Sequence, residues 1–529
     1  MIKKEYLFAI VISIIVLFFS NAYVLVGLGA PKEGLSYLGR QVTNSQDTYT
    51  YVSFIEQGRQ GKIFFSNLYT TEPQTATLIR PSYTFLGGAA YALGISSMNA
   101  YHLGRVLFTI AFMFVLYVFL KRFFHSPKRR LLAYAIVLFS SGLGYLVGGL
   151  FSESSDLWIP ESITFLSTQE APHFVLSQTL MLLAFLFLLK GWAHKRMRYF
   201  ACSFFALLLL GFEHPYNLLI CALTALGTGF YLYKSKMLSA KWVFIGIGSV
   251  GLGLTVGFGY QFLETLRNPT LSSWAAESSS PIPLNYLVGY GLLIPFALFG
   301  LEKYLHRRTP QNVLILSWLA SGSILMYAPV FFQRRLSEGF HIPLSILAAE
   351  GIIIVSIYVS QFALGKARNV VSYTIAIFFV IVLSIGTLVG SYKDIATVAG
   401  DSHNAYYYYL LTDEVKGMEW IRNNTKPNDA ILSNWFYGNI IPGISGRTTY
   451  IGHKAQTKEF DRKVEKINKF LVSKNTQESL NFLKVNKIKY IYIGKNDSML
   501  RFGFKPAQKP YLEKVFDAGE VKIYRVEEF

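Results

Sequence analysis

The chain has 529 residues, of which 52% are hydrophobic and only 15% are charged. A soluble protein carries roughly 25% charged residues, so this composition excludes a wholly soluble protein. The net charge of +19 does not indicate a nucleic-acid partner, because most Lys and Arg stand in short clusters between apolar segments, as they do in cytoplasmic loops.

The apolar segments predict an α-helical polytopic membrane protein with about eleven spans. The first follows Lys3-Lys4 and is too long for the apolar core of a cleaved signal peptide, so we expect it to stay as a retained helix. The predicted spans are 7–27, 101–121, 131–151, 173–190, 199–213, 214–233, 242–263, 285–301, 311–331, 343–364 and 370–391.

Basic clusters fall between alternate spans, which predicts the orientation in the membrane. They are Lys3-Lys4, Lys121 to Arg130, Lys190 to Arg198, Lys234 to Lys241, Lys303 to Arg308 and Lys366-Arg368. The positive-inside rule places these clusters and the N-terminus in the cytoplasm, so the C-terminal part emerges outside the plasma membrane. Counting 82–96 as a span would reverse every later cluster. At about 15 residues it is short of the ~20 needed, and we predict an interfacial or re-entrant helix.

This topology divides the chain into a membrane domain, 1–391, and an extracytoplasmic domain, 392–529. The longer loops, including 29–100 and 152–172, all lie outside. No GxxxxGK motif is present in the sequence, and the one GxGxxG match, residues 246–251, lies within a predicted span, so a cytoplasmic site for a nucleotide-activated donor is not indicated. We therefore expect the chemistry at the outer face, with a lipid-carried substrate.

Asp47 is the first acidic candidate, in the long outer loop and flanked by aromatic residues that suit a membrane interface. A carboxylate there can accept a proton from an acceptor hydroxyl that attacks an anomeric carbon. The alternative is a solvated or helix-capping Asp.

The second outer loop brings Asp156 and Glu161 to the same side of the membrane. Either carboxylate could hold a divalent cation or position the acceptor, and ordinary loop solvation is the alternative. Glu213 and His214 are the ionisable pair in the apolar run 199–233. Ionisable groups near a bilayer indicate a functional role, and an interfacial turn is an equally weighted alternative.

Arg334 and Arg335 break the charge pattern, because they lie outside between two spans. Guanidinium groups bind phosphate through two parallel hydrogen bonds, so the pair fits a lipid-phosphate site, with contact to anionic lipid headgroups as the alternative.

Residues 392–529 have the composition of a soluble domain. Short strands are predicted at 430–433, 448–451 and 490–493, helices near 413–424, 457–472 and 476–485, and a hairpin around Ala518-Gly519. This alternation predicts a small α/β domain with a partly parallel sheet.

Taken together, the layout resembles that of the C-type (GT-C) membrane glycosyltransferases that use polyprenyl-phosphate sugars. The resemblance rests on Asp47 after the first span, a juxtamembrane helix after Arg80-Pro81, the acidic second loop and Arg334-Arg335 before a late span. It implies transfer of a sugar to a glycan, lipid or protein acceptor, with Asp47 as the catalytic base. It also implies that Asp156 or Glu161 holds a metal or the acceptor, and that Arg334, Arg335 and Arg80 bind the carrier phosphate.

Two departures leave alternatives open. The first motif is Gln46-Asp47 and not a pair of acids, so Mg²⁺ or Mn²⁺ is a candidate cofactor without a complete motif. Residues 434–438, Asn-Trp-Phe-Tyr-Gly, are similar to the Trp-Trp-Asp-Tyr-Gly region of oligosaccharyltransferases but lack its acid. Protein glycosylation of that kind, a transporter or flippase, and a non-catalytic scaffold are the competing hypotheses.

Overall fold

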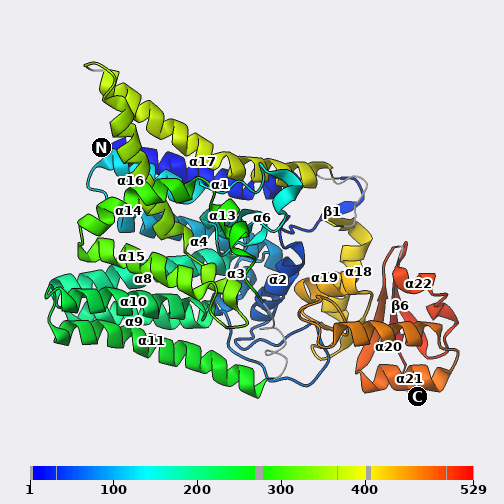
Figure 1. Ribbon diagram of the computed structural model, residues 1–529. Coiled ribbons are helices and arrows are strands. Elements are labelled where there is room, and N and C mark those ends of the chain that lie inside the picture. The colour runs from blue at the N-terminus through cyan, green and yellow to red at the C-terminus, as the bar shows by residue number, and fades with distance from the viewer. Residues whose placement is uncertain are drawn as a thin grey trace. The chain divides into compact units, whose positions relative to one another are not determined.

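The computed structural model describes residues 4–30, 32–268, 278–365, 367–400, 407–495 and 497–527. Lys3 and Lys366 of the predicted basic clusters lie outside the described residues. The chain forms two compact units. The first contains Met1–Tyr23, Gly104–Phe262 and Glu277–Ala396, and the second contains Val24–Leu103, Leu263–Ala276 and Thr397–Phe529. Figure 1 shows both units and labels many of their elements.

The first unit is helical, and four of its long helices continue into the second unit. Its helices are α1 (Lys4–Gly29), α4 (Ser97–Leu120), α5 (Pro127–Phe139), α6 (Ser155–Trp158), α7 (Thr164–Gln169), α8 (Pro172–His194), α9 (Met197–Glu213), α10 (Asn217–Lys234), α11 (Ala240–Arg267), α13 (Pro283–Tyr290), α14 (Leu293–His306), α15 (Pro310–Leu325), α16 (His341–Ser360) and α17 (Ala367–Gly400), with short 3₁₀ turns η1 (Gly148–Phe151) and η2 (Gln333–Ser337).

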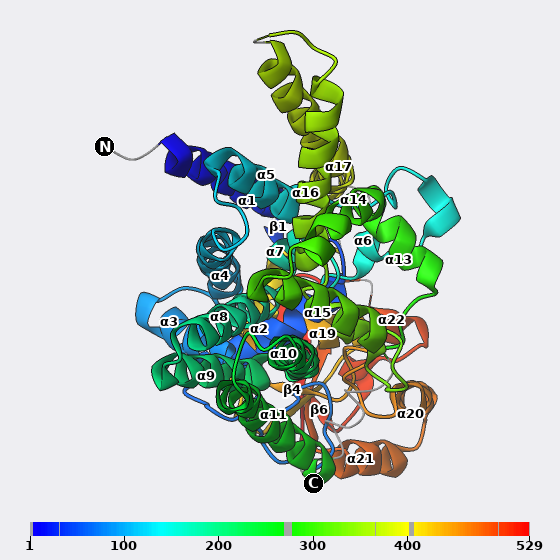
Figure 2. The same cartoon turned by 60° about the vertical axis from the view of Figure 1, so that its left-hand side comes forward.

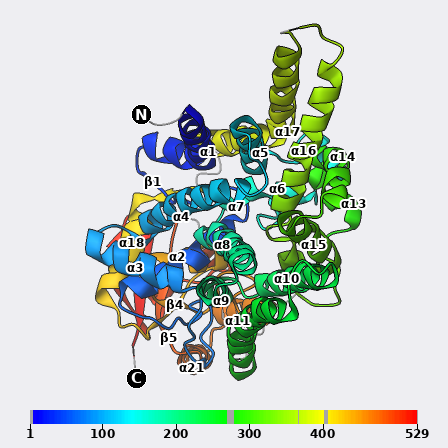
Figure 3. The same cartoon turned by 90° about the vertical axis from the view of Figure 1, so that its left-hand side faces the viewer.

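Small residues let these helices approach closely. A methyl group on Gly300 of α14 or Gly351 of α16 would meet the backbone of the facing helix, so both positions require glycine. Gly211 of α9 and Gly257 of α11 meet in the same way. Figures 2 and 3 show α8, α9, α10 and α11 running alongside one another. Close packing of this kind holds helices together where lipid removes the hydrophobic driving force.

The structure bears out a multi-pass membrane protein but does not confirm eleven spans. Among the described residues, six helices are long and apolar enough to cross a membrane, or seven if α13 and α14, bent by 83°, form one broken span. Several predicted spans form shorter helices: α5 has only 13 residues, α9 has 17 and α15 has 16. An apolar run in the sequence includes loop residues as well as helix, so its length overstates the helix.

The second unit joins the long loop after α1 to the C-terminal residues. Strand β1 (Leu35–Tyr37) pairs antiparallel with β2 (Tyr409–Leu411), with Leu35 opposite Leu411. Helices α2 (Ser45–Arg59) and α3 (Pro81–Leu93) pack against each other. A methyl group on Gly87 would meet the backbone of α2. Helix α3 corresponds to the predicted segment 82–96, and its 13 residues are too few to span.

The rest of the second unit is the predicted α/β structure with a partly parallel sheet. Its strand order is β4-β3-β5-β7-β6; β3 pairs parallel with β4 and β5, and the remaining pairs are antiparallel. The strands are β3 (Ala430–Leu432), β4 (Thr448–Thr449), β5 (Ile488–Ile493), β6 (Leu512–Ala518) and β7 (Val521–Val526), and the helices are α18 (Thr412–Asn424), α19 (Trp435–Ser445), α20 (Phe460–Val472), α21 (Thr476–Val485) and α22 (Ser498–Arg501), with 3₁₀ turn η3 (Pro506–Gln508).

Candidate active site

Asp47 lies in the first turn of α2, in the second unit. The helix starts after Asn44, whose φ of 48° is the left-handed conformation that Asn tolerates better than most residues. A carboxylate in the first helical turn interacts favourably with the positive end of the helix dipole. The Asp47 side chain is 43% exposed, so solvent or a substrate can reach it.

A buried arginine fixes the start of α2. The guanidinium of Arg40, only 1% exposed, donates from Nε to the carbonyl of Ser45 at 3.1 Å, and from its other nitrogens to the Tyr407 carbonyl and Asn439 Oδ1. The Asn439 amide in turn donates to the Gln46 carbonyl at 3.2 Å. Burial lowers the pKa of Arg40 from its ordinary value. The turn that carries Asp47 is therefore held by residues far along the chain.

His453 is the hydrogen-bond partner of Asp47. Its Nε2 lies 2.7 Å from Asp47 Oδ1. Its Nδ1 accepts the backbone N–H of Ala455 at 3.2 Å, so the hydrogen of the neutral ring sits on Nε2 and points at the carboxylate. The imidazole is buried, with 7% of its side chain exposed. No motif in the sequence points to His453.

Arg80 immediately precedes α3, and its side chain packs against α2. It has a φ of 49°, which is uncommon for a residue other than glycine and is often found at functional sites. Its guanidinium packs over the Tyr51 ring, 5.2 Å from the centroid. Tyr51 is four residues after Asp47, so both face the same side of α2. The structure thus places Arg80, at the start of α3, beside Tyr51, which lies one turn after Asp47 on α2.

The 434–438 segment begins α19 next to the first turn of α2. Asn434 caps the helix by accepting the N–H of Tyr437 at 3.0 Å. Trp435 is 45% exposed, whereas the Phe436 ring lies 5.9 Å from the Arg40 guanidinium. The side chain at 434 is therefore occupied by the helix cap, and the indole is accessible.

Two buried carboxyl groups, those of Glu414 and Asp497, interact with this segment. The Glu414 carboxylate accepts hydrogen bonds from the hydroxyl of Tyr437 and, at 3.0 Å, from the N–H of Lys495. Asp497 is 1% exposed and accepts the N–H of Met499 at 2.9 Å. Burial raises the pKa of Glu414 and raises that of Asp497 to about 6.

In the first unit, Asp156 is a buried acceptor. Its carboxylate accepts the N–H of Gly144 at 3.0 Å and the hydroxyl of Ser154 at 2.5 Å, and it is 1% exposed. Burial raises its pKa above the ordinary range. These bonds tie the loop after α5 to α6. The buried, hydrogen-bonded Asp156 carboxylate is therefore placed to hold the loop in position more than to bind a metal ion or an acceptor.

The other predicted residues of the first unit gather around η2. Glu161, Glu213 and His214 are all buried, and the Glu161 carbonyl accepts the N–H of Gly339. His214 Nδ1 lies against the buried Glu338 carboxylate, and the His173 ring centroid lies 5.8 Å from that of His214.

The two arginines of η2 pack on aromatic rings in the same region. Arg334 lies 4.6 Å from the Trp158 ring centroid, and Arg335 lies 5.3 Å from that of Tyr216. Tyr216 follows His214 by two residues, and their ring centroids are 5.4 Å apart. Cation–π contacts of this kind leave guanidinium N–H groups able to bind phosphate oxygens.

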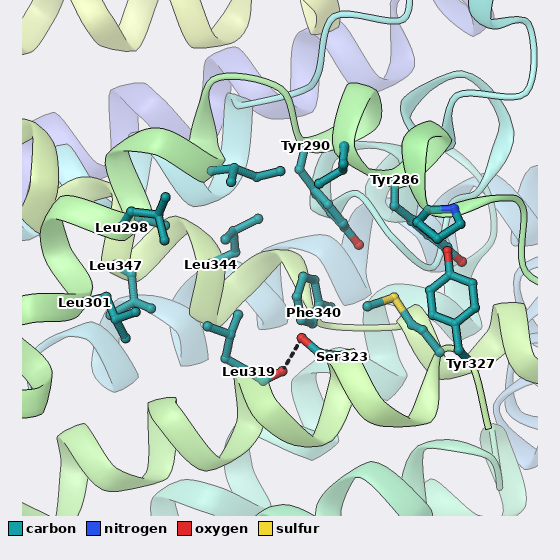
Figure 4. A pocket seen from close by; sticks show the side chains of 15 residues that line it. Tyr286, Tyr290, Leu298, Leu301, Leu319, Ser323, Tyr327, Phe340, Leu344 and Leu347 are labelled. Atoms are coloured by element: carbon teal, nitrogen blue, oxygen red, sulfur yellow. Dashed lines mark hydrogen bonds between the residues drawn. The ribbon is translucent and has the colours of Figure 1, made fainter.

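The first unit also contains an apolar cavity of about 340 Å³. Residues of α13, α14, α15 and α16 line it, and Figure 4 shows aliphatic side chains on one side and Tyr286, Tyr290 and Tyr327 on the other. Ser323 is the small residue on its α15 wall, with its hydroxyl bonded to the Leu319 carbonyl in Figure 4. Such a lining suits a hydrocarbon chain.

The described residues contain no group of three or more His, Cys, Asp or Glu side chains placed to hold a metal ion. Near Asp47, the adjacent ring nitrogen of His453 carries a hydrogen and cannot act as a ligand in that state. The predicted Mg²⁺ or Mn²⁺ remains a prediction.

Comparison with known proteins identifies the fold. No protein-family model and no curated protein matches the sequence. Several solved structures resemble the chain, and the three described next are each 12% identical to it in sequence. The Archaeoglobus fulgidus oligosaccharyltransferase tethered to an acceptor peptide with an NVT sequon has a TM-score of 0.56, over 92% of this chain and 68% of that one. The same organism's AglB oligosaccharyltransferase, with an inhibitory peptide and a dolichol-phosphate, has a TM-score of 0.55 over 93% and 70%. ArnT from Cupriavidus metallidurans, bound to undecaprenyl phosphate, has a TM-score of 0.52 over 99% and 98%.

The chain therefore has the GT-C fold of polyprenyl-phosphate-dependent membrane glycosyltransferases, as the sequence predicted. At this identity the likeness establishes the fold. The activity has to be argued from the site.

Proposed function

We propose that this protein transfers a sugar from a polyprenyl-phosphate carrier to an acceptor on the outer face of the plasma membrane. The observation that carries the proposal is the accessible carboxylate of Asp47, at the start of α2 and hydrogen-bonded to His453, in a chain with the GT-C fold. The basic clusters support a cytoplasmic N-terminus and an extracytoplasmic C-terminus.

The reaction is a direct displacement at the anomeric carbon. Asp47 accepts the proton of an acceptor hydroxyl while the acceptor oxygen forms a bond to the anomeric carbon. The bond from that carbon to the carrier phosphate breaks, and its electron pair leaves with the phosphate. General-base catalysis of this kind contributes about 10²- to 10⁴-fold to the rate.

Arginines and the apolar cavity suit the carrier. Arg80, which precedes α3 and packs over Tyr51 of α2, can neutralise the leaving phosphate, and Arg334 and Arg335 are the candidates of the first unit. The cavity among α13 to α16 can take part of the polyprenyl chain.

The 434–438 segment favours a glycan or lipid acceptor over a peptide. Phe436 stands where oligosaccharyltransferases have an acid, so this segment offers no carboxylate to a sequon hydroxyl. The Asn434 side chain is used as a helix cap. Trp435 presents an exposed apolar face on which the C–H groups of a sugar ring can pack. Peptide glycosylation is therefore the second candidate.

The test is a transfer assay. Membranes that contain wild-type protein, Asp47→Asn, or the control Asp461→Asn at an exposed site in α20 receive radiolabelled polyprenyl-phosphate sugars and cell-envelope extract. We expect label in acceptor with wild type and control, and a loss of at least about 100-fold with Asp47→Asn. Donor that crosses vesicles without a covalent product would support a flippase, and full activity of Asp47→Asn would refute the assigned base.

A further inference from the structure

We infer that His453 is a positioning residue, which holds the Asp47 carboxylate in the orientation and ionisation state that proton abstraction requires. The inference rests on the proposed function, in which Asp47 accepts a proton. His453 follows β4, so the C-terminal part of the chain supplies a component of the reacting site as well as a surface for the acceptor.

The direction of the hydrogen bond follows from the other ring nitrogen. Because Nδ1 of His453 accepts the N–H of Ala455, Nε2 donates to Asp47 Oδ1, at 2.7 Å. A hydrogen bond donated to a carboxylate stabilises its ionised form and therefore lowers its proton affinity. His453 thus keeps Asp47 ready to accept a proton.

The imidazole is fixed much more firmly than the carboxylate. The carbonyl of His453 accepts N–H groups from Gln456 at 3.1 Å and Thr457 at 2.9 Å. The Thr457 hydroxyl donates to the Tyr69 carbonyl at 3.0 Å, and the Tyr69 ring meets the imidazole edge-on at 6.3 Å. A buried, anchored donor can therefore orient the accessible Asp47 side chain.

Other titratable groups pack against these two segments. They include Arg40 and Tyr407 at the start of α2 and Tyr69 beside the imidazole, and Lys454 follows His453 in the chain. Arg40 donates to Ser45, Tyr407 and Asn439, so it stabilises the turn. His453 bonds directly to the Asp47 carboxylate.

Two substitutions separate the donor from the bulk of the ring. His453→Leu removes the N–H, whereas the amide of His453→Gln can place one near the Nε2 position. For His453→Leu we expect kcat to fall about 10- to 100-fold with an unchanged KM for the donor lipid. The acidic limb of the pH–rate profile should move to higher pH. For His453→Gln most activity and the wild-type profile should remain, as they should for His306→Leu, an exposed histidine in the first unit.

A second readout needs no activity. Carbodiimide reacts with protonated carboxyl groups, so labelling of Asp47 against pH, followed by peptide mass spectrometry, reports its titration in the full-length protein. We expect the midpoint to move to higher pH in His453→Leu and to stay in His453→Gln. An unchanged midpoint in the Leu variant overturns the inference, and so does an equal loss of activity in both variants with unshifted pH profiles. A shifted midpoint without transfer by wild type supports the Asp47–His453 pairing but refutes the proposed function.

Discussion

Replacing Asp497 by Asn should stabilise the protein at neutral pH. Asp497 precedes α22, is 1% exposed and caps that helix through its bond to Met499. Burial raises its pKa from 3.8 to about 6. The folded state then holds a proton more tightly than the unfolded state, so stability falls as pH rises from about 4 to about 6 and is level above that.

The expected size follows from that shift. About two pKa units at roughly 1.4 kcal/mol each give about 3 kcal/mol of destabilisation at pH 7.5, as an upper value. Asn caps helices about as well as Asp, so the variant keeps the bond to Met499 and avoids the cost of a buried charge. Asp497→Asn should therefore gain up to about 3 kcal/mol at pH 7.5 and well under about 1 kcal/mol at pH 4.

The assay is hydrogen exchange of the segment 488–501 in detergent-solubilised full-length protein, with thermal melting alongside. Wild type and Asp497→Asn are compared at pH 4 and pH 7.5, with Asp461→Asn, at an exposed position of α20, as the control. Slower exchange in the variant at pH 7.5 alone supports the reasoning. An equal gain at both pH values, or a loss at pH 7.5, refutes it.

Three further substitutions test other parts of the structure. Arg40→Met leaves the carbonyls at the start of α2 without a charged donor, and thermal melting should show a loss of about 3 kcal/mol together with lower transfer activity. Ser323→Trp should fill the apolar cavity and raise KM for long-chain donors in a chain-length series, while Ile324→Trp, at the next and exposed residue, should not. Gly438→Ala brings a methyl group against the Ile451 carbonyl and should lower stability by about 1–3 kcal/mol in thermal melts.

Sequence patterns predicted the elements that depend on local order. The strands at 430–432 and 488–493, the final hairpin and the short helix after Arg80 all follow from local hydrophobic periodicity and turn residues. His453 could not be found in this way, because 406 residues separate it from Asp47 and the pair exists only in the folded unit. The count of about eleven spans is not confirmed for a related reason: hydropathy measures an apolar run, and the fold decides where the helix within it ends.

The pairing of β1 with β2 explains why the long loop after α1 is ordered. A loop of this length pays a large conformational cost unless its backbone groups find partners. Residues 35–37 pair with 409–411, and Arg40 donates to both Ser45 and Tyr407. The same contacts that order the loop fix the first turn of α2. The C-terminal part of the chain is thus needed to build the Asp47 environment. It contributes to catalysis by holding the first turn of α2 in its folded position.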